Sequence, residues 1–322
     1  MNDKYLIGLA DKLMKADRRS LAQAISIAEN GGRDADILMR QVADNFPEVD
    51  TIGITGPPGA GKSTLINAMV GVARKRGLQV AILAVDPSSP ISGGAVLGDR
   101  TRMIDHADDD GVFFRSVAAR GHLGGLCLNV QDIVDVMAAA GWDLIILETV
   151  GAGQSEVEIA QIADINIVAA APGLGDDVQA IKAGILEIAD ILVVNKADND
   201  GAEETQRQLI AMTRLRKPEA ADVAVLKTVA TSHEGVEALF DHACGLLSHQ
   251  EPGFRMVQRQ RRAKQALADR VADRVRNHII HSESDELDEL LEAATSRTAS
   301  THEIETRLLR DLLTELAAKS DT

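Results

Sequence analysis

The sequence predicts an α/β fold in which a doubly wound, mostly parallel sheet carries helical additions at both ends of the chain. Short apolar segments alternate with helical ones between residues 51 and 250. Segments such as DLIILE and DILVVN are apolar without interruption, which is typical of strands buried on both faces of a parallel sheet. In the stretch 51–70, a glycine-rich loop joins a strand-like segment to a helical one, as in many α/β proteins.

Residues 1–50 are predicted to form two or three short helices that pack on the sheet domain. Leu6, Leu9 and Leu13 recur at helical spacing, and the pattern resumes after the break at Gly31-Gly32. Covering apolar surface is the expected role of these helices.

Seven strands are expected within the central domain, and helices between them would form right-handed crossovers. They cover residues 51–55, 79–85, 112–116, 144–148, 165–169, 191–194 and 223–228. Each of the polar motifs described below is expected to fall just after one of these strands. Ligand sites in such sheets lie at the carboxyl ends of the strands, so we expect the motifs to meet there.

The last part of the chain is predicted to be a helical arm. A turn at Glu251-Pro252-Gly253 precedes a helical pattern over 254–320. Residues 255–276 hold eight Arg or Lys residues, which suggests nucleic acid, but Asp269 and Asp273 interleave with them. A solvated helix face or a subunit contact is the preferred interpretation. The predicted parts are therefore an N-terminal extension (1–50), a central domain (51–250) and a C-terminal arm (251–322).

Composition argues against several classes of protein. The 322 residues carry a net charge of −15, whereas nucleic-acid binders usually present a basic face. Cys127 and Cys244 show no CxxC spacing, so neither a disulfide framework nor a zinc site is expected. No apolar run approaches the roughly 20 residues that span a bilayer, and the charged N-terminus does not resemble a signal peptide. We expect a cytoplasmic protein with no nucleic-acid or membrane partner.

Residues 56–63, GPPGAGKS, match the phosphate-binding pattern G-x-x-x-x-G-K-[ST] between a strand and a helix. Glycines let the backbone curl and aim its N–H groups at phosphate oxygens. Lys62 is expected to reach the β- and γ-phosphates, and the Ser63 hydroxyl to bind Mg²⁺. The alternative is a glycine-rich turn without a ligand. The predicted nucleotide contacts in this loop are Gly59, Ala60, Gly61, Lys62, Ser63 and Thr64.

The base of the nucleotide is expected to be read by Asn195-Lys196-Ala197-Asp198, which has the pattern N-K-x-D of GTPases. The Asp198 carboxylate would accept hydrogen bonds from the guanine N1–H and 2-amino groups. Adenine offers no donor there, which would leave the carboxylate unpaired. After the last strand, the backbone N–H of Ala230 is a weaker candidate for contact with guanine O6.

Two aspartates are candidates for the metal site. Asp86 ends the second strand, where a carboxylate can hold Mg²⁺, usually through water. Asp99 lies in the next loop, which we interpret as a first switch, with Asp99 near the metal or the attacking water. A helix N-cap is an equal alternative for Asp99.

Glu148-Thr149-Val150-Gly151 resembles the D-x-x-G switch of GTPases, with glutamate in the place of aspartate. The backbone N–H of Gly151 would contact the γ-phosphate. We found no obvious arginine finger, so slow intrinsic hydrolysis is expected. The predicted catalytic residues are Lys62, Asp99 and Glu148, and the predicted Mg²⁺ ligands are Ser63, Asp86, Asp99 and Glu148.

Taken in order, GPPGAGKSTL, AVDPSSP, GDRTRM, RGHLGGL, ETVGAGQSE and VNKAD resemble the methylmalonyl-CoA mutase-associated GTPases of the MeaB/ArgK type. The resemblance covers essentially the whole chain. It implies a homodimeric GTPase that acts as a chaperone for an adenosylcobalamin-dependent acyl-CoA mutase. Such a protein would gate cofactor loading and protect or reactivate the mutase, and its C-terminal arm would form the dimer.

The same resemblance implies a third switch in PGLGDDVQAIKAG, with Asp176, Gln179 and Lys182 as signalling residues. An acidic, glycine-rich loop near the nucleotide could reorder when the γ-phosphate is lost. Alternatively, Asp176 and Asp177 simply complement a helix dipole.

Three other functions compete with this hypothesis. A kinase or ATPase accessory to lysine/arginine/ornithine transport is disfavoured by NKAD and by the lack of an H-R-D motif. A nickel-insertion GTPase would need a Cys/His cluster, which two isolated cysteines and scattered histidines do not supply. A protein-targeting GTPase would normally bring an additional binding module.

Overall fold

The fold comes from a computed structural model of the chain. The structure describes residues 1–43, 48–86, 106, 108–118, 129–149, 162–173, 187–214, 223–249, 253–281 and 285–320. The chain forms two compact units, Met1–Arg259 and Gln260–Thr322, and each is described by itself. The three-part division expected from the sequence stays a prediction.

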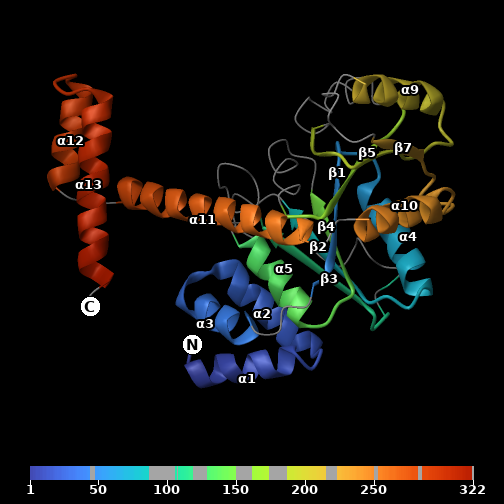
Figure 1. The fold of residues 1–322 in the computed structure, drawn as a ribbon, viewed down its shortest axis with the longest axis horizontal. Coiled ribbons are helices and arrows are strands. Elements are labelled where there is room, and N and C mark those ends of the chain that lie inside the picture. Colours follow the sequence, from blue (N-terminus) through green and yellow to red (C-terminus); the bar gives the residue numbers. More distant parts are fainter. Residues whose placement is uncertain are drawn as a thin grey trace. The chain divides into compact units, whose positions relative to one another are not determined.

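The first unit is built on a seven-stranded sheet in which all paired strands run parallel (Figure 1). Strands β2, β3 and β4 lie on one side of β1, and β5, β6 and β7 lie on the other, in the order β3-β2-β4-β1-β5-β6-β7. This is the predicted doubly wound arrangement. The strands are β1 Asp50–Thr55, β2 Val80–Asp86, β3 Val112–Ala118, β4 Leu144–Thr149, β5 Ile165–Ala170, β6 Ile191–Val194 and β7 Ala224–Lys227.

Helices cover both faces of this sheet. On one face lie α4 Lys62–Lys75 and α10 Val236–Ser248. On the other face, α5 Val130–Ala139 packs in the core of β2, β3 and β4, and α9 Ala202–Thr213 packs against β6 and β7. In β4, β5 and β6 every residue is buried, because successive side chains enter the two opposite cores.

Three helices precede the sheet: α1 Asp3–Leu13, α2 Arg18–Asn30 and α3 Gly32–Val42. Their apolar faces belong to the same core as α5 and the adjacent strands. Asn2 caps α1 by accepting the N–H of Lys4 at 3.0 Å, and Asp17 caps α2 by accepting the N–H of Ser20 at 2.8 Å. The N-terminal helices are therefore an integral layer of this unit.

Strand β3 lies at one edge of the sheet, and α2 covers it. Arg18, at the start of α2, donates to the carbonyl of Val112 at 2.5 Å. Arg115, in the middle of β3, donates to Ser26 Oγ at 3.0 Å. Edge strands offer unpaired backbone groups to other chains, and Arg18 occupies one of these groups, the carbonyl of Val112.

The C-terminal helices are α11 Phe254–His281, which contains the boundary between the units, α12 Asp285–Thr295 and α13 Thr301–Ser320. Leu287 and Leu290 of α12 are buried. At the start of α13, the backbone N–H of Ser300 donates to Glu303 Oε2 and the backbone N–H of Glu303 donates to Ser300 Oγ, which forms a capping box. None of the helices in the described part of the chain has the length and apolar composition needed to cross a bilayer.

Candidate functional site

The phosphate loop follows β1 at the carboxyl edge of the sheet and leads into α4 at Lys62. Gly56 and Gly61 have φ angles of +138° and +81°, which disfavour other residues. A Cβ on Gly56 would lie 2.1 Å from the carbonyl oxygen of Ala169 in β5, and a Cβ on Gly61 would lie 2.5 Å from Nδ2 of Asn195. Both glycines are thus required by the backbone conformation and by the close approach of the Ala169 carbonyl and the Asn195 side chain.

Lys62 curls back over this loop. Its side chain is 7% exposed, and Nζ donates to the carbonyl oxygens of Gly56 at 2.6 Å and Pro57 at 3.1 Å. The ammonium group is therefore held inside the curve of the loop. A phosphate bound by the loop amides would meet this positive charge.

The next residue, Ser63, contacts the end of β4. Its hydroxyl donates to Glu148 Oε1 at 2.5 Å, and Glu148 is 2% exposed. The pair offers only hard oxygen ligands, one from a hydroxyl and one from a carboxyl group, beside the phosphate loop. This donor set fits Mg²⁺, which prefers oxygen ligands and substrate phosphates.

Asn195 joins the phosphate loop to the expected base site. Its Nδ2 donates to the carbonyl oxygens of Ala60 at 2.9 Å and Gly61 at 3.3 Å. Its Oδ1 accepts from Thr228 Oγ1 at 3.1 Å and from the backbone N–H of Ala230 at 3.2 Å. With 1% of its surface exposed, Asn195 holds three segments of the chain together.

Lys196 and Asp198 follow Asn195 on the turn after β6, and both are exposed. Lys196 has a φ angle of +54°, and its Cε lies 3.6 Å from the point where a Cβ of Gly61 would stand. Its aliphatic stem therefore lies beside the phosphate loop. Asp198 remains accessible to a base, whereas Ala230 has its N–H directed at Asn195. The predicted contacts of both residues with guanine stay predictions.

Several predicted site residues cannot be placed fully. The backbone of Asp86 ends β2 at the carboxyl edge, paired with Ala118, while its side chain lies outside the described residues. The same holds for the whole of Asp99 and Gly151. The predicted third-switch residues Asp176, Gln179 and Lys182 also fall outside the described ranges.

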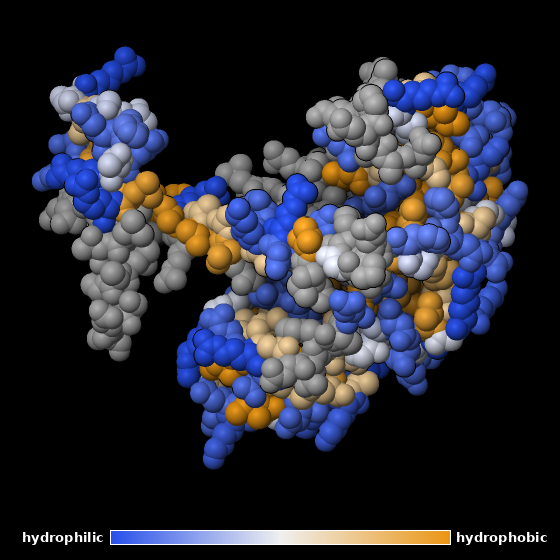
Figure 2. Space-filling view, in the orientation of Figure 1, coloured by the Kyte–Doolittle hydropathy of each residue, from blue (hydrophilic) through white to orange (hydrophobic). Residues whose placement is uncertain are grey.

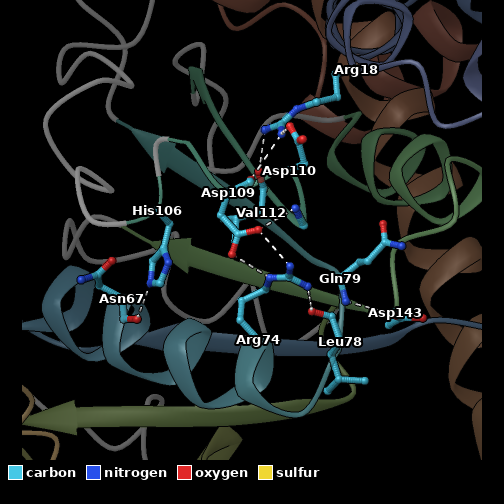
Figure 3. Close-up of polar contacts among 11 residues, drawn as sticks. Arg18, Asn67, Arg74, Leu78, Gln79, His106, Asp109, Asp110, Val112 and Asp143 are labelled. Atoms are coloured by element: carbon cyan, nitrogen blue, oxygen red, sulfur yellow. Dashed lines mark hydrogen bonds and ion pairs between the residues drawn. The ribbon is translucent and has the colours of Figure 1, made fainter.

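Helix α4 is fixed at its far end by an ion pair ahead of β3 (Figure 3). Arg74 donates to Asp109 through Nε at 2.8 Å and Nη2 at 2.9 Å. The hydrogen bond from Arg74 lowers the pKa of Asp109, and the same bond raises the pKa of Arg74. Close by, His106 Nε2 lies 3.2 Å from the carbonyl oxygen of Asn67 in α4. The helix that begins at the phosphate loop is thus anchored to the segment that enters β3.

The sequence motifs do not identify Thr228 as a site residue. Its hydroxyl donates to Asn195, and its side chain is 1% exposed. The one signal in the sequence is that the predicted strand 223–228 ends in a threonine, where a valine would fit equally well. Its importance follows from the pairing of β6 and β7, which brings it to Asn195.

A family model described as "Methylmalonyl Co-A mutase-associated GTPase MeaB" matches residues 21–284. A Pyrococcus horikoshii protein with a provisional GTPase name is 46% identical over 237 residues, covering 72% of this chain and 75% of that protein. GTPase ArgK of Escherichia coli is 35% identical over 294 residues, 88% of each chain. A solved LAO/AO transport system kinase covers 97% of this chain and 99% of its own, with a TM-score of 0.70 and 24% identity, a similarity of fold.

Proposed function

The chain belongs to the family of methylmalonyl Co-A mutase-associated GTPases, and we propose that its hydrolysis of GTP serves an adenosylcobalamin-dependent acyl-CoA mutase. In this proposal the protein gates cofactor loading and protects or reactivates the mutase. The family match over residues 21–284 carries the proposal. The Asn195 contacts support a guanine-nucleotide site, because they tie the expected base site directly to the phosphate loop.

The proposed nucleotide site holds GTP or GDP with Mg²⁺. Ser63 and Glu148, 2.5 Å apart beside the phosphate loop, support the metal site, and Asp86 and Asp99 complete the proposed ligand set. Bound Mg²⁺ would offset negative charge on the β- and γ-phosphates. Lys62 would bind the same phosphates, and the N–H of Gly151 would contact the γ-phosphate.

Communication with the mutase is proposed to use the third switch, with Asp176, Gln179 and Lys182. These residues follow β5, whose residue Ala169 contacts the phosphate loop at Gly56. A change in the conformation of the phosphate loop can therefore act directly on β5, the strand that precedes the proposed third switch.

The C-terminal arm, residues 251–322, is proposed to form a homodimer. Figure 2 shows apolar side chains at the surface along α11. Among the described side chains of α11, four aliphatic ones are more than half exposed: Val257, Leu267, Val271 and Ile280. Exposed aliphatic side chains recurring on one helix are typical of a surface that a partner covers.

The proposed partner can be tested with purified components. A methylmalonyl-CoA mutase-type enzyme would be titrated into the protein while GTP hydrolysis and complex formation are measured. We expect acceleration of at least about tenfold, equivalent to about 1.4 kcal/mol of barrier, and different affinities with a GTP analogue and with GDP. If no adenosylcobalamin-dependent acyl-CoA mutase binds or accelerates hydrolysis, the chaperone proposal is wrong while the GTPase assignment stands.

A further inference from the structure

Two strands next to the phosphate loop end in buried threonines. One is β1, which leads into the loop, and the other is β4, which carries Glu148. Thr55 is the last residue of β1, directly before Gly56, and Thr149 is the last residue of β4, directly after Glu148. Neither side chain has exposed surface, at 0% each. The Thr149 hydroxyl donates to Thr55 Oγ1 at 2.8 Å.

This hydroxyl pair lies on the opposite face of the sheet from the Ser63–Glu148 contact. Ile54 pairs in register with Glu148, so the next residues, Thr55 and Thr149, stand beside each other. Side chains alternate along a strand. Glu148 therefore points toward α4, where Ser63 donates to it, while the threonines point toward the face covered by α5.

The hydroxyl groups of Thr55 and Thr149 are not needed to fill the core. The core on this face is built from aliphatic and aromatic side chains, and valine has nearly the shape of threonine. A hydroxyl placed in such a core is unfavourable unless it has a hydrogen-bond partner. The Thr149 hydroxyl has its acceptor in the Thr55 oxygen, and the resulting bond is directional, which a pair of valines would not provide.

We propose that Thr55 and Thr149 are positioning residues for GTP hydrolysis. Their hydrogen bond fixes the end of β4 against the end of β1 and thereby sets Glu148 relative to Ser63. It also holds the start of the phosphate loop, where the carbonyl of Gly56 accepts from Lys62. The effect on turnover rests only on the GTPase activity, whereas any effect on Mg²⁺ dependence rests on the proposed metal site.

The first test replaces one hydroxyl, in Thr149→Val. We expect kcat to fall roughly tenfold, because loss of one directional hydrogen bond lets Glu148 leave its position. The affinity for GDP without Mg²⁺ should stay within about twofold, because the Asn195 contacts to the phosphate loop are unchanged. Because Glu148 is a proposed Mg²⁺ ligand, Thr149→Val should need a higher Mg²⁺ concentration than the wild type for half-maximal slowing of GDP release. If GDP release from the wild type does not respond to Mg²⁺, the proposed metal site is wrong. The role of the threonine pair is then tested by the change in kcat alone.

A matched control is available on the same strand and the same face. Thr51 is 3% exposed, and its hydroxyl donates to Asp164 Oδ2 at 2.8 Å, at the amino end of the sheet. Thr51→Val also removes a buried threonine hydrogen bond, and it should lower the melting temperature with kcat and Mg²⁺ dependence unchanged. An equal loss of kcat in Thr51→Val would overturn the proposal.

The double variant separates positioning from stability. Thr55→Val/Thr149→Val leaves no unpaired hydroxyl, so its melting temperature should return toward that of the wild type while kcat stays low. Thr149→Ser keeps the hydroxyl and should restore kcat. The proposal is overturned if kcat recovers in the double variant, or if Thr149→Val hydrolyses GTP at the wild-type rate.

Discussion

At the scale of single residues, the nucleotide site depends most on buried polar side chains that hold backbone segments. Asn195 is the main example, because both ends of its amide are occupied by protein groups. One end fixes the carbonyl of Ala60 and the other fixes Thr228. We therefore expect Asn195 to act on a ligand by keeping the phosphate loop and the predicted base site at a constant separation.

Asp198→Asn should change the preferred base. An amide can donate to the additional carbonyl of xanthine, whereas it cannot accept both hydrogen bonds of guanine as a carboxylate does. We expect GDP affinity to fall by roughly a hundredfold and xanthosine diphosphate affinity to rise. Binding of both fluorescent nucleotides is the measurement. Glu237→Gln, which also removes an exposed carboxylate, serves as a control. Unchanged GDP affinity in Asp198→Asn would contradict the predicted role.

Lys62→Ala should abolish measurable hydrolysis. The substitution removes the positive charge held at Gly56 and Pro57, where the phosphates are expected. A single-turnover assay at saturating GTP would measure the rate, and Lys75→Ala at the other end of α4 is the control. Hydrolysis at the wild-type rate in Lys62→Ala would mean that phosphates bind elsewhere.

The sequence predicts the site residues that lie in short contiguous patterns, such as Lys62 and Asn195. It does not predict the hydroxyl pair of Thr55 and Thr149, whose members are 94 positions apart. Their meeting depends on strand register, which residue spacing does not reveal. The same applies to Thr228, since only the pairing of β6 with β7 brings it to Asn195.

At the scale of elements, α4 is a rigid connection between the phosphate loop and the amino edge of the sheet. The Arg74–Asp109 pair holds its far end, with both side chains about one-quarter to one-third exposed, at 26% and 30%. Gly111 permits this arrangement, because a Cβ there would stand 2.0 Å from the guanidinium carbon. The anchor fixes where the chain enters β3.

Asp109→Asn should lower the free energy of unfolding by about 1 kcal/mol at neutral pH. The folded state lowers the pKa of Asp109, so the ion pair stabilises the protein above the unfolded pKa of about 4. That stabilisation is lost as the pH falls through the pKa of Asp109 in the folded protein. The difference in free energy of unfolding between Asp109→Asn and the wild type should then shrink. Urea unfolding at several pH values would measure it.

Asp110→Asn is the control for this prediction. Its carboxylate is adjacent in sequence but fully exposed, at 103%, and lies 3.4 Å from Arg18. We expect no measurable change in the free energy of unfolding, because solvent screens a fully exposed carboxylate. If the difference in free energy of unfolding between Asp109→Asn and the wild type does not vary with pH, the charge of the Asp109 carboxylate does not contribute to stability.

Element positions follow closely from apolar patterning. The predicted strand 191–194 is observed unchanged, and 79–85 is observed as Val80–Asp86. Strand order is less accessible, because β4 is inserted between β1 and β2 and nothing in the local sequence specifies that placement. Long-range packing decides such an insertion.

At the scale of the whole molecule, the proposed dimer is open to a direct test. Val271→Glu places a charge on an exposed apolar position of α11 and should lower the molar mass in solution from dimer to monomer. Light scattering after size-exclusion chromatography would measure it. Ala272→Glu adds the same charge at the next, also exposed position and should leave the mass unchanged. A monomeric wild-type protein would contradict the proposal outright.

The helices α1–α3 share one core with α5, although α2 ends at Asn30 and α5 begins at Val130. This distance has a consequence for synthesis on the ribosome. At 5–20 residues per second, α2 emerges roughly 5–20 s before the helix that completes its core. During that interval Leu21 and Ile25, which are buried in the finished protein, have no final partner from α5. The nascent chain therefore presents an apolar surface that general chaperones would be expected to shield until residue 139 has emerged.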